Sequence, residues 1–172
     1  MNLLDYIPIV QDFPKPGVGF RDVSPLLANP NAFSKALDLL NDQFAQSDYD
    51  VIAGIDSRGF IFGTALARLT GKPFVMIRKA NKLPPETLRV SYELEYGSDH
   101  LEIRKGLLQP TDRVLIVDDV LATGGTLLAS KQLIEMAGAR VCGALTLLEI
   151  AFLGGSKKLA QQNLLFRAAL CV

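Results

Sequence analysis

The sequence contains few of the residues that build disulfide scaffolds or histidine-based sites. Its 172 residues include two cysteines, one histidine and no tryptophan. Cys142 lies in an apolar, strand-like run and Cys171 near the C-terminus, so we expect two free thiols rather than a disulfide or a metal site. The single histidine, His100, excludes a histidine metal centre and a Ser-His-Asp triad.

The chain also lacks an excess of either charge, because 18 Lys and Arg residues balance 18 Asp and Glu residues. A neutral chain has no bulk field to hold nucleic acid, so we expect no nucleic-acid partner. No apolar run is long enough to span a bilayer, and the first residues lack the basic start and apolar run of a secretory signal. These absences predict a cytoplasmic protein that is not bound to a membrane.

What is present is typical of one globular domain. The hydrophobic fraction is 49% and the charged fraction 21%, which argues against disorder. The length suits a single domain over residues 1–172 with one core.

Short apolar runs alternate with helical patterns along most of the chain. The pattern predicts buried strands at 51–55, 74–77, 113–117 and 141–148. It predicts helices at about 30–44, 60–69 and 126–137, then a short helix after Gly155 and an edge strand over 164–172. This order predicts an α/β fold with a mostly parallel central sheet flanked by helices.

Two segments depart from that alternation. Residues 1–30 are rich in proline and glycine and predict an ordered arm without a helix. In residues 81–103, Val90 and Tyr92 begin an alternation of apolar and polar side chains that continues to Tyr96. This alternation, with a turn at residues 97–99, predicts a β-hairpin that projects from the sheet.

Polar residues gather where the predicted buried strands end. Polar residues follow three of these strands, namely Asp56-Ser57-Arg58 after the first, Arg78-Lys79 after the second and Asp118-Asp119 after the third. Ligands of open α/β sheets bind beyond the carboxyl ends of the strands. We therefore expect these side chains to line one binding site.

The strongest motif is a buried strand, an acidic pair, a loop of small residues and a helix start. The loop comprises Ala122, Thr123, Gly124, Gly125 and Thr126. Its backbone N–H groups and hydroxyls at a helix N-terminus suit a phosphate monoester, while the preceding carboxylates suit sugar hydroxyls. A plain turn capped by threonine is the alternative, but the acidic pair and the buried strand disfavour it. The P-loop and dinucleotide fingerprints are absent.

Residues 116–126 resemble the PRPP-binding motif of the type I phosphoribosyltransferases, in the form found in their adenine-specific branch (PRPP is phosphoribosyl pyrophosphate). Residues 13–22, 53–60, 77–84 and 91–97 agree with that family in the same order, so the resemblance runs from about Phe13 to Leu159. It implies transfer of the 5-phosphoribosyl group from PRPP to adenine, giving AMP and pyrophosphate. It also implies an N-terminal hood over residues 1–30 and a catalytic hairpin loop over residues 81–105.

The resemblance assigns roles to residues at each end of PRPP. It places the 5′-phosphate on residues 122–126 and the ribose hydroxyls on Asp118 and Asp119. It places pyrophosphate on the loop of Asp56, Ser57 and Arg58. The cations that it implies for this site are Arg58, Arg78 and Lys82.

The base and the chemistry fall to other residues. The backbone of Gly19 and Arg21 reads the adenine edge in the family, and Phe20 stacks on the ring. Glu95 corresponds to its general base and Tyr96 to that base's partner, with Arg58 as a catalytic cation. Mg²⁺ is expected to arrive bound mainly to PRPP rather than to protein ligands. Because some members take a pyrophosphate cation from the other subunit, a homodimer is also expected.

Two other functions remain open at this stage. One is a phosphoribosyltransferase that acts on another base, such as xanthine or orotate. The other is a non-enzymatic purine or PRPP sensor, which would need a DNA-binding segment that this sequence lacks.

Overall fold

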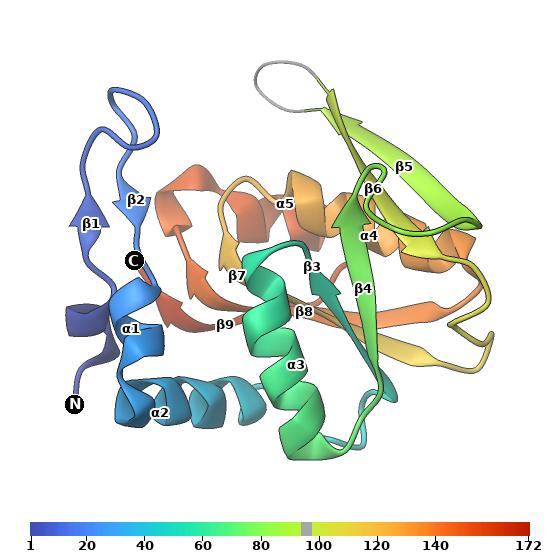
Figure 1. Cartoon of the computed structure of the whole chain (residues 1–172), viewed down its shortest axis with the longest axis horizontal. Helices are drawn as coiled ribbons and strands as arrows, with labels where there is room; N and C mark the ends of the chain where they lie inside the picture. The colour runs from blue at the N-terminus through green and yellow to red at the C-terminus, as the bar shows by residue number, and fades with distance from the viewer. Residues whose placement is uncertain (94–97) are drawn as a thin grey trace. The chain divides into compact units, whose positions relative to one another are not determined.

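The structure is a computed structural model that describes residues 1–93 and 98–172 (Figure 1). It divides into two compact units, residues 1–39 and residues 40–172. The single-domain prediction is not tested by that division, and each unit is described separately here.

The N-terminal unit contains short elements, namely η1 (Leu3–Tyr6), β1 (Ile9–Val10), β2 (Phe20–Arg21), α1 (Ser24–Ala28) and most of α2 (Pro30–Asn41). Strands β1 and β2 pair antiparallel. The prediction of an arm without a helix is wrong at α1, because Pro25 lies in the first turn, where a missing N–H costs no helical hydrogen bond. The predicted start of α2 is confirmed, since Asn29 Oδ1 accepts hydrogen bonds from the backbone N–H of Asn31 and Ala32.

The second unit holds the remaining elements. These are β3 (Val51–Ile55), α3 (Arg58–Thr70), β4 (Phe74–Lys79), β5 (Thr87–Glu93), β6 (Ser98–Arg104), β7 (Arg113–Leu121), α4 (Gly125–Met136), β8 (Arg140–Glu149), η2 (Ala151–Leu153), α5 (Gly155–Gln161) and β9 (Phe166–Cys171). Its sheet has the strand order β5-β6-β4-β3-β7-β8-β9. Strands β4, β3, β7, β8 and β9 run parallel, and β6 and β5 join antiparallel. The predicted α/β fold with a mostly parallel sheet is confirmed.

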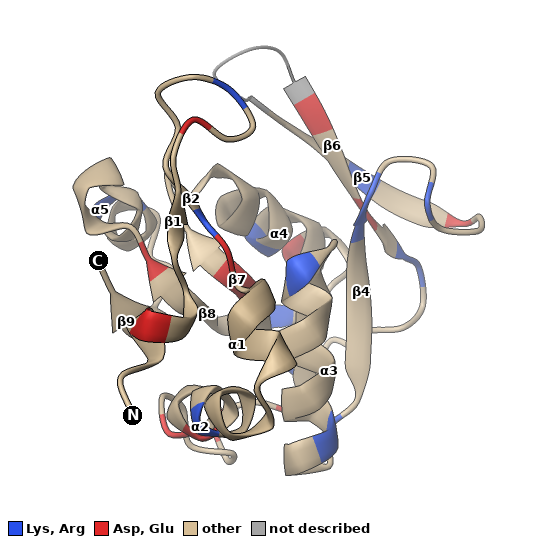
Figure 2. Ribbon diagram, turned by 60° about the vertical axis from the view of Figure 1, so that its left-hand side comes forward, with Lys and Arg blue, Asp and Glu red and all other residues tan. Residues whose placement is uncertain are grey.

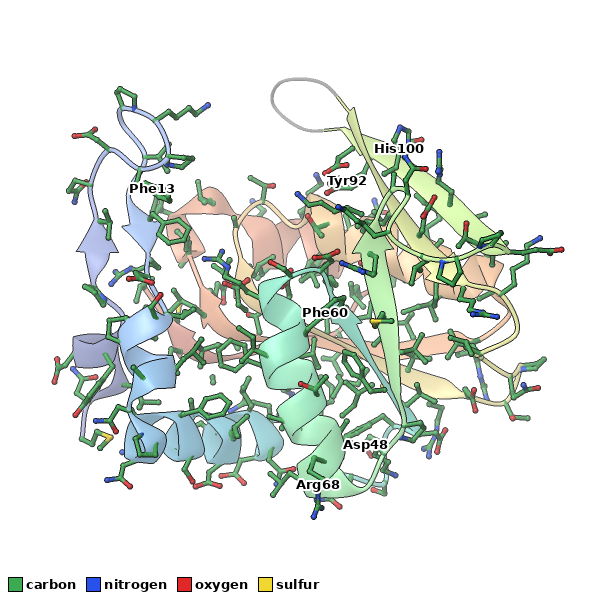
Figure 3. All side chains as sticks on the ribbon, in the orientation of Figure 1. Phe13, Asp48, Phe60, Arg68, Tyr92 and His100 are labelled. Atoms are coloured by element: carbon green, nitrogen blue, oxygen red, sulfur yellow. The ribbon has the colours of Figure 1, made fainter. Side chains whose placement is uncertain are left out.

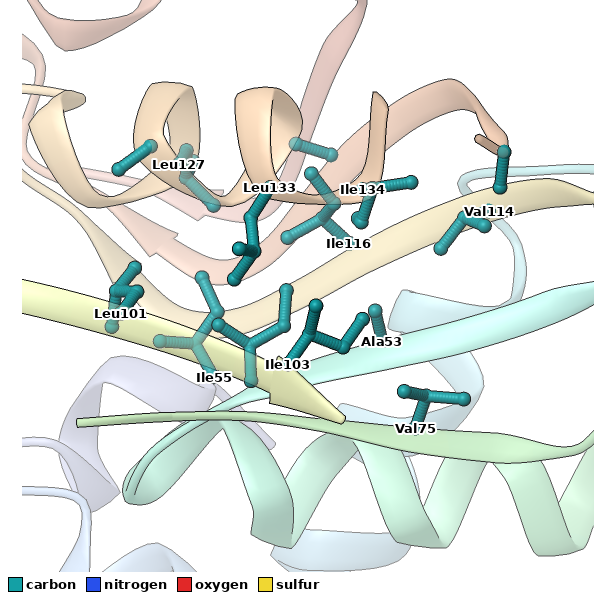
Figure 4. Packing of buried hydrophobic residues seen from close by; sticks show 14 of the residues in the cluster. Ala53, Ile55, Val75, Leu101, Ile103, Val114, Ile116, Leu127, Leu133 and Ile134 are labelled. Atoms are coloured by element: carbon teal, nitrogen blue, oxygen red, sulfur yellow. The ribbon is translucent and has the colours of Figure 1, made fainter. Parts of the chain in front are cut away.

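The core lies between this sheet and helix α4, while α3 covers the opposite face (Figure 4). Ile116 of β7 and Leu133 and Ile134 of α4 have no exposed surface. Burial of each such side chain contributes about 1.5–3 kcal/mol before the entropy cost of ordering is counted. Within the described residues, no helix is both long enough and apolar enough to cross a membrane.

The base of the hairpin differs from its prediction. Strand β6 pairs with β4, so the lower part of the hairpin continues the sheet instead of projecting from it. The base of the hairpin joins the sheet because its apolar side chains Val90, Leu101 and Ile103 are buried in the core beside α4. A freely projecting hairpin would leave these side chains in water.

Candidate active site

A cavity of about 480 Å³ opens in the second unit beyond the carboxyl ends of β3 and β7. Ten of the residues predicted from the sequence line it, namely Asp56, Ser57, Arg58, Asp118, Asp119, Ala122, Thr123, Gly124, Gly125 and Thr126. Charged positions of both signs lie at the ends of β4 and β7 and at the start of α3 (Figure 2). The structure therefore brings the predicted phosphate loop, acidic pair and Asp56–Arg58 loop to one cavity.

The acidic pair lies inside a strand and not in a loop after one. Strand β7 continues to Leu121 because Asp118 pairs with Thr146 and Val120 with Leu148 of β8. Pairing with β3 on the other side stops at Val117. The two carboxylates are thus carried on a rigid strand whose other edge is open to the cavity.

The loop after β7 leads into α4 without a side-chain cap. Gly124 has a φ of 85°, which a residue with a Cβ adopts only at a cost, and α4 begins at Gly125. In the described structure no side chain caps α4, so the alternative of a threonine-capped turn is excluded. Helix α3 likewise begins at Arg58 with no side-chain cap. Two helix N-termini, each favouring negative charge, therefore meet at the cavity.

The start of helix α5 packs against the predicted phosphate loop. A Cβ added to Gly155 would lie 2.2 Å from the carbonyl oxygen of Ala122, and one added to Gly124 would lie 3.1 Å from Leu159 Cδ2. The backbone of α5 therefore touches the loop at a distance that only glycine permits. This contact holds the backbone of the loop against the start of α5.

Arg58 and Asp119 form an ion pair across the cavity wall. Arg58 Nε lies 2.8 Å from Asp119 Oδ2, and Asp119 is 5% exposed. Burial raises the pKa of Asp119, and the Arg58 charge opposes that rise. Burial, together with the neighbouring Asp119 charge, raises the pKa of Asp118 well above its ordinary value. Among the described residues, the ion pair of this acidic pair is the one between Arg58 and Asp119, which leaves acceptor capacity for a ligand.

We predict that Asp118→Asn stabilises the ligand-free protein while weakening binding. The pKa of Asp118 is raised in the folded protein, so ionisation of this carboxyl is less favourable in the folded state than in the unfolded state. At a pH above the ordinary pKa of 3.8, the carboxyl therefore lowers the stability of the fold. The variant should therefore melt at a higher temperature than the unaltered protein near neutral pH. The difference should shrink as the pH falls toward about 4, where the unfolded carboxyl also takes up a proton.

The same variant should bind PRPP about tenfold more weakly, since a neutral acceptor replaces a charged one. Melting scans across pH and titration with PRPP measure both effects. Asp42→Asn, an exposed carboxyl beyond α2, is the control and should change neither quantity. A lower melting temperature for Asp118→Asn at neutral pH would contradict the prediction.

Two predicted pyrophosphate cations do not line the cavity. Arg78 Nε donates to Asp56 Oδ2 at 2.9 Å, and its Nη1 donates to the carbonyl oxygen of Lys82 at 3.2 Å. The Arg78 guanidinium also lies 5.8 Å from the centre of the Phe60 ring. Lys82 is exposed, and no ion pair of its amine is found among the described residues. Arg78 thus holds the loop that carries Lys82, and both remain predictions as ligand contacts.

Two further polar residues line the cavity: Lys79, which was expected there as part of a polar strand end, and Tyr92, which was not expected as a ligand contact. Tyr92 reaches it from β5, and Lys79 from the end of β4. The Tyr92 hydroxyl donates to Asp99 Oδ2 at 3.4 Å, and Lys79 Nζ lies 3.8 Å from the same oxygen. Burial raises the pKa of Tyr92, while a hydrogen bond with Thr126 lowers it. Figure 3 shows Tyr92 on the hairpin and Phe60 on α3. Tyr92 is on the apolar side of the alternating pattern, and this pattern was the sequence signal that its side chain faces inward.

The other predicted residues lie elsewhere. Gly19, Phe20 and Arg21 belong to the N-terminal unit, where the Phe20 ring packs edge-on against Phe13 at 5.1 Å. Arg21 Nη1 donates to the carbonyl oxygen of Ile7 in the same unit. Glu95 and Tyr96 lie outside the described residues. The base-binding and general-base assignments therefore stay predictions.

The donor set suits a metal that arrives with its ligand. Within the described ranges, no three His, Cys, Asp or Glu side chains cluster closely enough to hold a metal ion. Mg²⁺ commonly takes one or two carboxylates together with phosphate oxygens and waters. Asp118 and Asp119 can supply such carboxylates, so the site fits Mg²⁺ carried by a pyrophosphate but offers no complete protein cage.

The sequence matches the phosphoribosyl transferase domain family over residues 22–163. The adenine phosphoribosyltransferase of Polynucleobacter necessarius (strain STIR1) is 58% identical over 163 residues, which cover 95% of this chain and 94% of that relative. This similarity spans nearly the whole chain.

Solved structures agree with the sequence comparison. The adenine phosphoribosyltransferase of Rhodothermus marinus superposes with a TM-score of 0.92 at 42% identity, covering 99% of this chain and 96% of that one. The Saccharomyces cerevisiae enzyme, complexed with an imino-altritol bisphosphate and adenine, superposes with a TM-score of 0.90 at 38% identity, covering 98% and 96%. The fold and the sequence thus point to the same group of proteins.

Proposed function

The chain belongs to the phosphoribosyltransferase family, and from that membership we propose how its cavity carries out the reaction. The enzyme transfers the 5-phosphoribosyl group from PRPP to adenine, giving AMP and pyrophosphate in purine salvage. The observation that carries the assignment of the site is the phosphate loop at the N-terminus of α4, flanked by the acidic pair of β7.

The 5′-phosphate binds to residues 122–126. The positive φ of Gly124 and the start of α4 direct backbone N–H groups toward the cavity. Each charge-assisted hydrogen bond to the phosphate contributes roughly 1.5–3 kcal/mol. Asp118 and Asp119 accept hydrogen bonds from the ribose hydroxyls, which places C1′ of the ribose between the phosphate loop and the start of α3.

The pyrophosphate binds to Asp56, Ser57 and Arg58 at the N-terminus of α3. Negative charge accumulates on pyrophosphate as its bond to C1′ breaks, so donors fixed there lower the barrier. Arg58 is already oriented by Asp119, which limits the reorganisation needed during the reaction. Mg²⁺, where it accompanies PRPP, would neutralise part of the same charge, and Asp118 and Asp119 are the carboxylates that could help to hold it. Arg78 and Lys82 add positive charge from the loop after β4.

The base binds to Gly19, Phe20 and Arg21. The backbone of Gly19 and Arg21 reads the adenine edge, and Phe20 stacks on the ring, by correspondence with the family's motif. Glu95 accepts the proton that leaves the imidazole ring of adenine, and Tyr96 positions it.

We further propose a homodimer in the cytoplasm. A cation supplied to the neighbouring subunit's pyrophosphate site is one role that suits the exposed Lys82. The two free thiols, Cys142 and Cys171, are usual in a reducing compartment. Gel filtration with light scattering measures the subunit number.

Purified protein mixed with PRPP, Mg²⁺ and adenine tests the function. AMP and pyrophosphate should form in equal amounts and only when all three are present. A protein that binds PRPP or purine without releasing pyrophosphate would instead be a sensor, which would overturn the proposed function.

A further inference from the structure

A buried carboxylate at the base of the hairpin has no role in the reaction as described above. Glu102 of β6 is 2% exposed, yet it carries an ionisable group. Such groups are rarely buried unless they are paired. Glu102 is paired with Arg89 and with the backbone of the loop between β4 and β5.

Glu102 lies in the middle of a row of alternating charges across three strands. It is directly opposite Arg78 of β4 on one side and Arg89 of β5 on the other. Directly opposed residues of antiparallel strands share one face of the sheet. Since Arg78 also pairs with Asp56, the row runs from the proposed pyrophosphate loop to the outer hairpin strand (strand order in Figure 1).

The Glu102 carboxylate holds the loop between β4 and β5. Its Oε2 accepts a hydrogen bond from the backbone N–H of Asn81 at 3.1 Å, and its Oε1 accepts one from Arg89 Nε at 2.8 Å. Arg89 Nη2 also donates to Asn81 Oδ1 at 3.1 Å. Asn81 adopts a φ of 63°, a left-handed conformation that these contacts hold in place.

The next residue along the chain is Lys82. Arg78 Nη1 donates to the Lys82 carbonyl oxygen, so Glu102 and Arg78 fix two consecutive residues from two strands. The Lys82 backbone is therefore held on both sides while its amine stays exposed. A side chain so placed can present its charge in a fixed direction.

We propose that Glu102, with Arg89, is a positioning residue that fixes the loop bearing Lys82 and thereby sets the affinity for the pyrophosphate end of PRPP. This inference rests on the proposed function. Glu102 acts through the loop and touches no substrate. Removing its charge should therefore alter pyrophosphate recognition and leave adenine recognition unchanged.

Glu102→Gln keeps the size of the side chain and removes its charge. We expect the KM for PRPP, and for pyrophosphate in the reverse reaction, to rise about 3- to 30-fold, the range found for residues coupled to a site. The KM for adenine should not change, and kcat should change much less than the KM for PRPP. A uniform loss of activity, or an unchanged KM for PRPP, would overturn the inference.

A matched control lies at the same base of the hairpin. Lys105 Nζ and Glu86 Oε2 form an ion pair of 3.1 Å between side chains that are 49% and 78% exposed. Exposed pairs contribute little, so Glu86→Gln should leave the KM values for PRPP, pyrophosphate and adenine unchanged. If Glu86→Gln reproduces the effect, then general loosening of the hairpin is the cause and the inference fails.

The Lys82→Ala background tests whether Glu102 acts through the loop. Once Lys82 has lost its amine, adding Glu102→Gln should raise the KM for PRPP no further, whereas independent effects would multiply. Multiplying effects would contradict the proposal. If Glu102→Gln does not fold, Arg89→Lys replaces it, because lysine keeps the charge but loses the paired N–H donors. The same selective rise in KM is expected, and its absence overturns the inference.

The two proposals fail in different ways. If the unaltered protein forms no AMP from adenine and PRPP, the proposed function is wrong. If the unaltered protein is active and Glu102→Gln keeps its KM for PRPP, only the role of Glu102 is wrong.

Discussion

Hypoxanthine and guanine are expected to react about 10⁴-fold less efficiently than adenine, because a site that reads hydrogen bonds rejects a base whose donors and acceptors are exchanged. Adenine places an amino donor beside the N1 acceptor. The other two purines place a carbonyl acceptor beside an N1–H donor. A backbone carbonyl and N–H fixed to match adenine, as proposed for Gly19 and Arg21, would then face like groups. The ratio of kcat/KM for each base, measured by pyrophosphate release, gives the discrimination.

Phe20→Leu provides the control for this prediction. Stacking depends on ring area and not on the order of donors and acceptors, so losing the aromatic ring should weaken all bases alike. The ratio between adenine and hypoxanthine should therefore survive even as the KM for adenine rises. Comparable turnover of adenine and hypoxanthine by the unaltered protein would show that the chain acts on another base.

The scaffold could be predicted because its signals are local. A strand in the middle of a parallel sheet is buried on both faces, so Val51–Ile55 reads as a continuous apolar run with the same bounds as β3. Two helix boundaries were also predictable from local signals. Asn29 caps α2, and Gly71, with a φ of 67°, ends α3 as predicted.

Features decided by distant partners could not be predicted. The extension of β7 through Asp118 and Asp119 depends on pairing with β8, which lies about 30 residues further along the chain. A pair of acidic residues after an apolar run otherwise indicates the end of a strand. Likewise, Arg78 was predicted to contact a ligand, but its partner Asp56 lies 22 residues away in the sequence. The strand ends predicted that the two side chains lie at one edge of the sheet, but no local pattern showed that they pair with each other.

The same distinction between local signals and distant partners applies to the candidate site. The position of residues 122–126 at the cavity was predictable because the strand, the loop and the helix start lie within a few residues of one another, while phosphate binding by this loop stays a prediction. Tyr92 was missed as a cavity residue because its place depends on β5 packing beside α4, which joins segments about 30 residues apart. The Gly155 contact with the Ala122 carbonyl was missed for the same reason.

Glu95 follows the described part of the hairpin strand, where Tyr92 lines the cavity. The reaction joins a purine ring nitrogen to C1′, and neutral adenine must lose the proton on its imidazole ring as that bond forms. A carboxylate near the ring is the natural acceptor for this proton. The sequence has two glutamates two positions apart, Glu93 and Glu95, so the role of one can be measured against the other.

Glu95→Gln should fold, bind PRPP nearly normally and lose about 10²–10⁴-fold in kcat, the usual cost of removing a general base. The expected split arises because the amide keeps the shape of the side chain but cannot accept the proton. Glu93→Gln is the matched control, two residues away with the same change of charge, and should alter kcat little. Melting temperature, PRPP titration and single-turnover AMP formation measure fold, binding and chemistry separately. Equal and small effects of the two substitutions would show that both carboxylates serve only as solvated surface, and the proton acceptor would then have to be sought among other groups.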